Sequence, residues 1–245
     1  MKRNQSGFTL IEIAIVLVII GLLLGGVLKG QELINSAKVK NLATDFRNIP
    51  VFIYGYQDKF KALPGDDANV DAHLGGQCTT TSCKATGPAT CNNGSSGPCL
   101  GNGVIDGNWN DLATSGDETT QFWQHVRLAG LAAGATVTTD PTYIPTNATG
   151  GIIGIQSGTN TIAKTPITDP TGAIAIRGTY IICSAGILGK FVKQLDIQMD
   201  DGNPATGSMM AGLATAPGKP MTAVVLTGSG TLIDDALAYT VCMGV

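Results

Sequence analysis

The first sixty residues of the chain carry two hydrophobic patterns, one after the other. Residues 8–28 are dominated by apolar side chains, contain a single charge at Glu12, and follow a short basic leader. As a helix this segment is about 32 Å long, enough to cross the hydrocarbon core of a bilayer. Beyond it, apolar residues recur three and four positions apart, the spacing of one face of an amphipathic helix. They are Val39, Leu42, Phe46, Ile49, Ile53, Tyr56, Phe60 and Leu63.

The two patterns together predict one long helix from about residue 8 to residue 62. Pro50 lies inside the stripe, but the stripe resumes in phase after it, so we expect a kink rather than an end. The sequence Leu63-Pro64-Gly65 is expected to end the helix. The stripe needs a covering partner, so the chain divides into a leader (1–7), a membrane segment (8–28), an amphipathic continuation (29–63) and a globular head (64–245).

The remainder of the chain has the order of an α+β domain. Residues 66–117 form a Gly-, Asn- and Cys-rich loop with little periodicity, and helices are expected over 119–133 and 187–199. Strand patterns follow the loop at 151–155, 173–183, 208–211, 221–226 and 237–243. One long helix packed on a mainly antiparallel sheet is the predicted fold class.

The junction between leader and apolar segment reads Gly7-Phe8-Thr9-Leu10-Ile11-Glu12. A secretory signal peptide has a shorter apolar stretch and a cleavage site with small residues, which this chain lacks. A plain anchor explains the length and the basic leader, but not Glu12, which costs about 2.5–3.5 kcal/mol deep in a bilayer. The junction resembles the processing site of type IV prepilins and of type II secretion pseudopilins.

This resemblance implies a specific route of maturation. A prepilin peptidase would cut after Gly7, the new amine of Phe8 would be methylated, and Glu12 would become the fifth mature residue. It also implies a single-pass protein of the inner membrane with a periplasmic head. That protein is then assembled by inner-membrane machinery into an extracellular pilus or a periplasmic pseudopilus, as a homopolymer or a mixed filament. The implied fold is the pilin roll.

Two weaker similarities to prepilin-like proteins lie further along the chain, at 62–67 and 195–207, and the segment from Phe122 to Leu131 belongs to the same pattern. One departure is that Lys29 stands where pilins carry a proline, the 22nd mature position. The role of the chain in a filament is therefore open. The leading interpretation is a structural subunit of a pilus or pseudopilus. The alternatives are a low-copy tip pilin with an adhesive or binding head, and a membrane-anchored binding protein or enzyme that does not polymerise.

Glu12 has a physical role in the leading interpretation. If subunits stack with an axial stagger, Glu12 of one copy can neutralise the Phe8 amine of a neighbour in a dry filament core. A buried unpaired charge is far costlier than a paired one. The pair would thus set the register between otherwise featureless apolar helices.

Composition narrows the function further. The chain has 33 Gly, 11 Pro and 13% charged residues, which is typical of a loop-rich β domain outside the cell. Removal of residues 1–7 takes away Lys2 and Arg3, so 15 basic residues become 13 against 18 acidic ones, a net charge of −5. A specific nucleic-acid partner is not expected. Catalytic motifs are missing from the sequence, so we expect no enzyme.

The six cysteines favour disulfides, because a translocated head meets an oxidising compartment. Zinc is the competing interpretation, but the spacings are not of the CxxC type, and only His73 and His125, expected as ordinary surface or packed residues, would add to them. Fifteen connectivities are open. The preferred one joins Cys78 to Cys83, Cys91 to Cys99, and Cys183 to Cys242.

No cofactor is required, but one segment fits structural calcium. Asp106, Asn108, Asn110 and Asp117 occupy positions 1, 3, 5 and 12 of a calcium-type loop. Position 6 is Asp111 where Gly is usual, and Asp-Asn-Gly clusters are also ordinary turn formers. Asp200 and Asp201 are a second, less favoured candidate.

Overall fold

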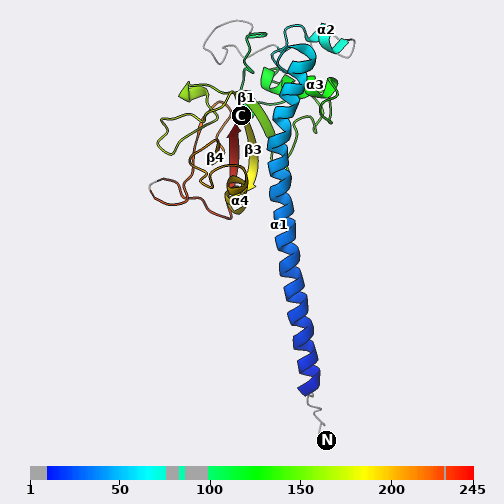
Figure 1. The fold of residues 1–245 in the computed structure, drawn as a ribbon, viewed down its shortest axis with the longest axis vertical. Helices are drawn as coiled ribbons and strands as arrows, with labels where there is room; N and C mark the ends of the chain where they lie inside the picture. Colours follow the sequence, from blue (N-terminus) through cyan, green and yellow to red (C-terminus); the bar gives the residue numbers. More distant parts are fainter. Residues whose placement is uncertain (1–9, 76–82, 86–98, 229) are drawn as a thin grey trace, which may run out of the picture.

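The computed structural model describes residues 10–75, 83–85, 99–228 and 230–245. Its longest element is helix α1 (Leu10–Phe60). The second half of α1 lies along the head, while the first half projects away from it as a bare rod (Figure 1). The arrangement is α+β and pilin-like, as predicted.

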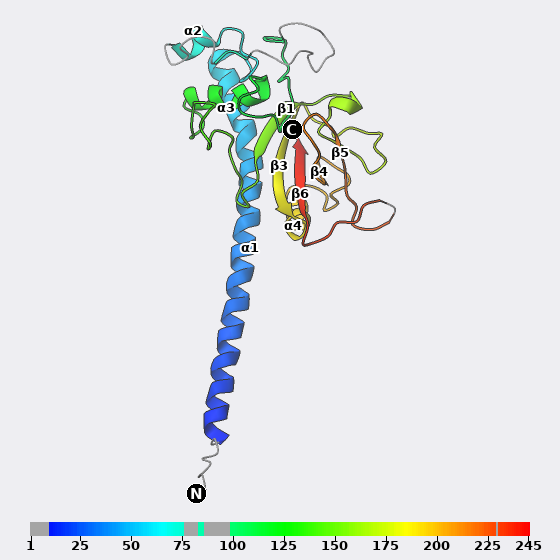
Figure 2. The same cartoon turned by 180° about the vertical axis from the view of Figure 1, so that it is seen from behind.

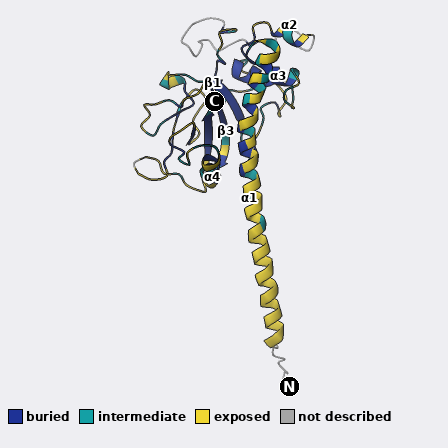
Figure 3. Cartoon of the chain, viewed as in Figure 1, coloured by how far each residue is buried: buried dark blue, intermediate teal, exposed yellow. Residues whose placement is uncertain are grey.

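The predicted apolar stripe is the face on which α1 is buried. Its residues from Val39 to Tyr56 are each at most 4% exposed, whereas every residue from Leu10 to Lys29 is exposed. Figure 3 shows this division along the helix. Packing against the head therefore covers only one half of α1.

Pro50 lies in the interior of α1, which continues to Phe60. The prediction that Pro50 does not end the helix is thus confirmed. The helix stops two residues before the expected position, because Lys61 takes a left-handed φ of 56°. The N–H of Lys61 still donates to the carbonyl of Gln57 at 2.8 Å, which satisfies one of the orphan carbonyls at the helix end.

The sheet of the head has four strands in the order β1-β3-β6-β4, and all three pairings are antiparallel. The strands are β1 (Ile153–Ser157), β3 (Tyr180–Leu188), β4 (Met209–Gly212) and β6 (Ala238–Gly244). Figure 2 shows β3 and β6 side by side in the middle of the head. A separate parallel pair joins β2 (Ile167–Thr168) to β5 (Met221–Thr222).

Side chains on the two faces of the sheet belong to different cores. Ile182, Tyr239 and Val241 lie in the cluster that includes the buried stripe of α1. The residues next to them along the strands, such as Ile181 and Cys242, point to the other face. They lie in a second cluster with Ile167 and Met221 of the parallel pair. The period-two alternation of the strands thus places α1 on one face and the β2–β5 pair on the other.

Short helices complete the described part of the fold: α2 (Val70–Leu74), α3 (Glu118–Leu128), η2 (Ile162–Lys164) and α4 (Gly189–Met199). Helix α4 contributes Phe191, Val192 and Leu195 to the core that contains α1. In α3 every residue from Glu118 to Arg127 is buried, although most of them are polar. The expected end of α3 at residue 133 was wrong, because Gly130 takes a left-handed φ of 77° and closes the helix.

Two strand predictions were too long. Residues 173–179 do not join β3, because the Asp169 carboxylate accepts the N–H groups of Ala173 at 2.9 Å and Ile174 at 2.8 Å and holds a turn there. Strand β5 stops at Thr222, and beyond Ala223 the backbone N–H groups bond to other segments: Val224 donates to the carbonyl of Ala211 and Val225 to that of Thr231. Both segments have the apolar composition of a strand, but hydrogen bonds outside a regular ladder hold their backbone.

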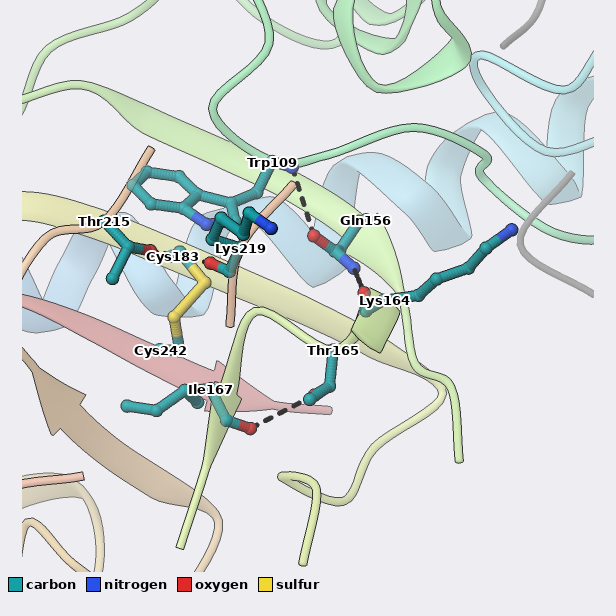
Figure 4. Close-up of a disulfide and its surroundings, with 9 residues drawn as sticks. All are labelled: Trp109, Gln156, Lys164, Thr165, Ile167, Cys183, Thr215, Lys219 and Cys242. Atoms are coloured by element: carbon teal, nitrogen blue, oxygen red, sulfur yellow. Dashed lines mark hydrogen bonds between the residues drawn. A yellow bond between two sulfur atoms is a disulfide. The ribbon is translucent and has the colours of Figure 1, made fainter. Parts of the chain in front are cut away.

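The predicted bridge between Cys183 and Cys242 is present and joins directly opposed residues of β3 and β6. Both cysteines are fully buried, and Trp109 packs against their cluster. Figure 4 shows the bridge with the Trp109 ring and Lys219 beside it. The bridge ties the last strand of the chain to the centre of the sheet.

Replacing Cys183 and Cys242 together with Ser should lower the free energy of unfolding by about 2–5 kcal/mol. The bridge closes a sequence separation of 59 residues, so its loss restores much freedom to the unfolded chain. Urea unfolding of the full chain in detergent, followed by circular dichroism, measures the change. An unfolding curve that matches the wild-type curve would contradict the proposed contribution.

Candidate assembly segment and sites in the head

The apolar half of α1, defined here as Leu10–Leu28, is the largest uncovered apolar surface among the described residues. Leu10 is 89% exposed, Leu22 is 74% exposed, and the branched side chains between them are all exposed. By length and composition, α1 is the one helix in the described part of the chain that can cross a membrane. Contiguous apolar surface of this size marks an interaction site.

Glu12 lies in the first turn of α1 as described, and it is exposed on this otherwise apolar segment. An acidic group near a helix N-terminus is favourable to the helix dipole. The predicted cleavage and methylation site, Gly7 and Phe8, lies outside the described residues. The roles assigned to Gly7, Phe8 and Glu12 therefore stay predictions.

Three glycines on the apolar half leave room for a close neighbour. A Cβ added at Gly21, Gly25 or Gly26 would meet nothing within 4 Å, so the head does not use this space. Lys29 and Glu32 form an exposed ion pair at 2.7 Å directly after the apolar half. This pair marks the boundary at which charged residues return to the helix.

Two more cysteines of the head are disulfide-bonded, Cys83 and Cys99. Cys78 and Cys91 lie outside the described residues, so the pairing predicted within the loop stays a prediction. Among the cysteines that the structure describes, none is free.

The residues of the predicted calcium loop form local hydrogen bonds. The buried Asp106 carboxylate accepts a bond from Asn102 Nδ2 at 2.8 Å. The N–H of Asp111 donates to the carbonyl of Asn108 at 3.1 Å, the bond of an ordinary turn, and the Asn108 side chain donates to Asp111 Oδ1 at 3.0 Å. In the described ranges no three His, Cys, Asp or Glu side chains converge as a metal site requires.

The other residues proposed to bind calcium also have structural roles or local hydrogen bonds. Asp117 is the N-cap residue of α3, and burial together with the neighbouring Asp111 raises its pKa. Asn110 is half-buried. In the second candidate, Asp200 accepts the N–H of Met209 and Asp201 accepts the Thr206 hydroxyl, both at 2.8 Å. Calcium stays a prediction for both loops.

A cluster of buried carboxylates that sequence analysis missed lies where the end of α1, the following loop and α3 meet. Asp66, Asp106 and Glu118 are at most 3% exposed. The Asp66 carboxylate accepts the N–H groups of Gly101, Asn102 and Gly103, and Glu118 Oε2 accepts the N–H of Asp106 at 2.8 Å. Burial, reinforced by the neighbouring acids, raises the pKa of Glu118 from its ordinary 4.5 to about 8.

The next acid, Asp67, joins α1 to α2. Its Oδ2 accepts the Tyr56 hydroxyl at 2.8 Å and lies 2.7 Å from His73 Nδ1. The His73 ring stacks on Phe60. His125 is fully buried and accepts the N–H of Gly65 at 2.9 Å. Both histidines are thus packed structural residues, as the sequence suggested.

A cleft of about 580 Å³ opens beside these acids at the end of the head remote from the apolar half. Its walls include Gln57, Phe60, Asn69, His73 and Tyr180. Lys61, Asp66 and Asp67 add charged groups to these aromatic rings and amides.

Comparison with protein families finds the prokaryotic N-terminal methylation motif at residues 2–28. No curated protein matches the chain with significance. The same is true of solved structures.

The motif and the fold agree on a class of protein. The chain carries a prepilin-type methylation motif at the start of a long apolar helix, and the helix lies on a pilin-like α+β head. These features support the type IV pilin and pseudopilin family. The motif further implies processing by a prepilin peptidase, and the apolar helix suggests membrane anchoring.

The raised pKa of Glu118 predicts a loss of stability with rising pH. The folded state holds the proton more tightly than the unfolded state, so the stabilisation is complete below pH 4.5 and is lost as the pH passes about 8. Glu118→Gln should weaken this decline in the melting temperature. Asp58→Asn, at a carboxyl that is 91% exposed, is the matched control and should leave the decline unchanged. Identical profiles for wild type and Glu118→Gln would show that Glu118 is not the titrating group.

If the loop from Asp106 to Asp117 binds calcium, a chelator should lower the melting temperature of the full chain in detergent, because binding to the folded state alone is stabilising. Asp106→Ala should abolish that sensitivity, and Asp200→Asn should leave it in place. A melting temperature indifferent to chelator would leave these residues as turn formers.

Proposed function

We propose that the chain is a structural subunit of a type IV pilus or of a type II secretion pseudopilus, assembling through the apolar half of α1. One observation carries the proposal. The head fully buries side chains of α1 only from Val39 onward, and it leaves Leu10–Leu28 without any contact that hides its apolar side chains.

The energy at stake explains why this segment needs another environment. Burying one Leu, Ile or Val side chain is worth about 1.5–3 kcal/mol, and the apolar half exposes more than a dozen such side chains. A bilayer or a bundle of identical helices can cover them. We infer that the segment uses the inner membrane before assembly and the core of the filament afterwards.

Glu12 supplies a reason for the segment to move from the membrane into the filament core. In the bilayer its carboxylate costs about 2.5–3.5 kcal/mol when deep. In a filament it can pair with the amine of a neighbouring copy that has been cut to begin at Phe8, and pairing removes much of that cost. The open space at Gly21, Gly25 and Gly26 permits the close helix approach that such a core requires.

The implied partners follow from this route. They are a prepilin peptidase, the inner-membrane assembly machinery, and other copies of the chain or related pilins. The head would then lie in the periplasm or on the cell surface, and the buried Cys183–Cys242 bridge fits an oxidising compartment.

A second candidate function is a low-copy tip pilin. The observation in its favour is the cleft of about 580 Å³ at the end of the head remote from the apolar half, the end that a terminal subunit would present. A membrane-anchored protein that never polymerises would be indicated by its absence from sheared filaments.

The first test concerns processing. The membrane-bound protein should have the mass of a chain that begins at Phe8 and carries one added methyl group, because the junction matches the methylation motif. Intact-mass analysis measures this, and a Gly7→Val chain is expected to keep its leader. A mature protein that still begins at Met1, or that has been cut beyond Leu28, would reject the assignment.

The second test concerns Glu12. Glu12→Ala should leave membrane insertion intact or improved, because an expensive charge is removed from the apolar segment. Filament yield should fall, because the charge that sets the register is lost. The assay compares membrane-bound subunit with sheared filaments. Glu32→Ala is the matched control, since Glu32 lies on the same helix but pairs with Lys29. Normal filaments from Glu12→Ala would refute the pairing role.

A further inference from the structure

The end of the head nearest the apolar half of α1 is formed by α4. Figures 1 and 2 both show α4 at that end, beside α1. A groove between the two helices is lined by residues of α1 between Glu32 and Lys40 and by Gln194 and Gln198 of α4. The exposed side of α4 therefore lies close to whatever surrounds the apolar half.

Lysines gather at this end of the head, and we call their surface the lysine face. Two of these lysines lie over one aromatic ring. The ammonium nitrogens of Lys38 on α1 and Lys190 on α4 are 6.0 Å and 5.0 Å from the centroid of the Phe191 ring. The other members are Lys40, exposed on α1, and Lys193 on α4. The first turn of α4 contains no acidic residue. A lysine there opposes the helix dipole, so helix stability does not account for Lys190.

Nearby acids offset this charge only in part. Lys193 pairs with Asp235 at 2.8 Å, Lys29 pairs with Glu32 at 2.7 Å, and Asp234 precedes Asp235 in the loop. The lysine face and Lys29 thus bring five lysines against these three acids, whereas the chain as a whole is acidic. Asp196 of α4 is buried, and Asp200 and Asp201 follow the opposite end of α4 from Lys190.

The distance to a membrane surface is short enough for this charge to act. Lys38 comes ten residues after Leu28, about 15 Å along the helix axis. The headgroup region outside the hydrocarbon core is about 5–8 Å thick, and the Debye length is about 8 Å at physiological salt. A lysine side chain spans much of the distance left between the helix and the headgroups. The ammonium groups can therefore interact electrostatically with charged lipids.

We propose that the lysine face contacts the anionic lipid headgroups of the membrane into which the apolar half of α1 inserts. The inference rests on the proposed function, because it requires insertion. Lipid is favoured over an acidic surface of a second copy because the lysines adjoin the segment that would enter the bilayer. In addition, Ile197 on α4 is 71% exposed, and lysines beside an apolar side chain are typical of a helix at a membrane interface.

The test uses the full chain in phosphatidylcholine vesicles at one copy or fewer per vesicle. Electron paramagnetic resonance of trace spin-labelled lipids compares how phosphatidylglycerol and phosphatidylcholine associate with the protein. At low ionic strength we expect a preference of roughly two- to fivefold for phosphatidylglycerol. The preference should vanish near 1 M salt, where the Debye length is about 3 Å.

Two sets of variants locate the contact. Lys38→Gln, Lys190→Gln and Lys193→Gln combined should bring the ratio close to one, and the same three changes to Arg should preserve it. The control changes Lys59, Lys61 and Lys219 to Gln, removing equal charge elsewhere, and should match wild type.

The outcomes separate this inference from the proposed function. A chain that does not insert into vesicles overturns both. A chain that inserts with no lipid preference, or whose preference survives the three Gln changes, overturns the lysine face alone. A salt-sensitive association between copies that the Gln changes abolish, without any lipid preference, would assign the face to a second copy and would equally overturn the proposal.

Discussion

The whole molecule depends on how far its sheet reaches along α1. The buried stripe begins at Val39, and as far as Ile53 its residues form one core with β1, β3, β6 and α4. Tyr56, the last buried residue of the stripe in α1, packs in a separate cluster with α2. Nothing in the described chain reaches the nineteen residues of Leu10–Leu28. A head that covered more of α1 would be a more stable monomer, but it would have no apolar segment left for a membrane or a filament. The division of the helix is therefore the feature that the proposed function needs.

The head is stabilised by buried links between its elements. A bridge joins the two central strands at Cys183 and Cys242, and carboxylates tie loops to helices. Asp66 accepts three backbone N–H groups, and Asp67 connects Tyr56 of α1 to His73 of α2. Such bonds hold loops that have no hydrophobic periodicity of their own. They also make the junction sensitive to proton binding at Glu118, where burial favours the neutral acid.

Features that depend on local spacing were predictable from the sequence. The apolar segment, the stripe of α1, helix α4 and the bridge between Cys183 and Cys242 follow from periodicity or from position in a strand pattern. Strand β2, and with it the parallel pairing to β5, was missed because β2 has only two residues. The turn held by Asp169 was missed because it depends on side-chain hydrogen bonds. The burial of α3 was missed because it depends on partners far away in the sequence. The cluster of Asp66, Asp106 and Glu118 joins residues up to 52 positions apart, as counted in the sequence, and no short motif signals it.

The central claim is that Leu10–Leu28 is covered by other copies of the chain in a filament. Mass spectrometry of filaments sheared from cells that produce the protein tests this most directly, with the membrane fraction measured in parallel. The account predicts that the chain is an abundant component of the sheared filaments. A chain that is plentiful in the membrane but missing from the filaments would contradict it.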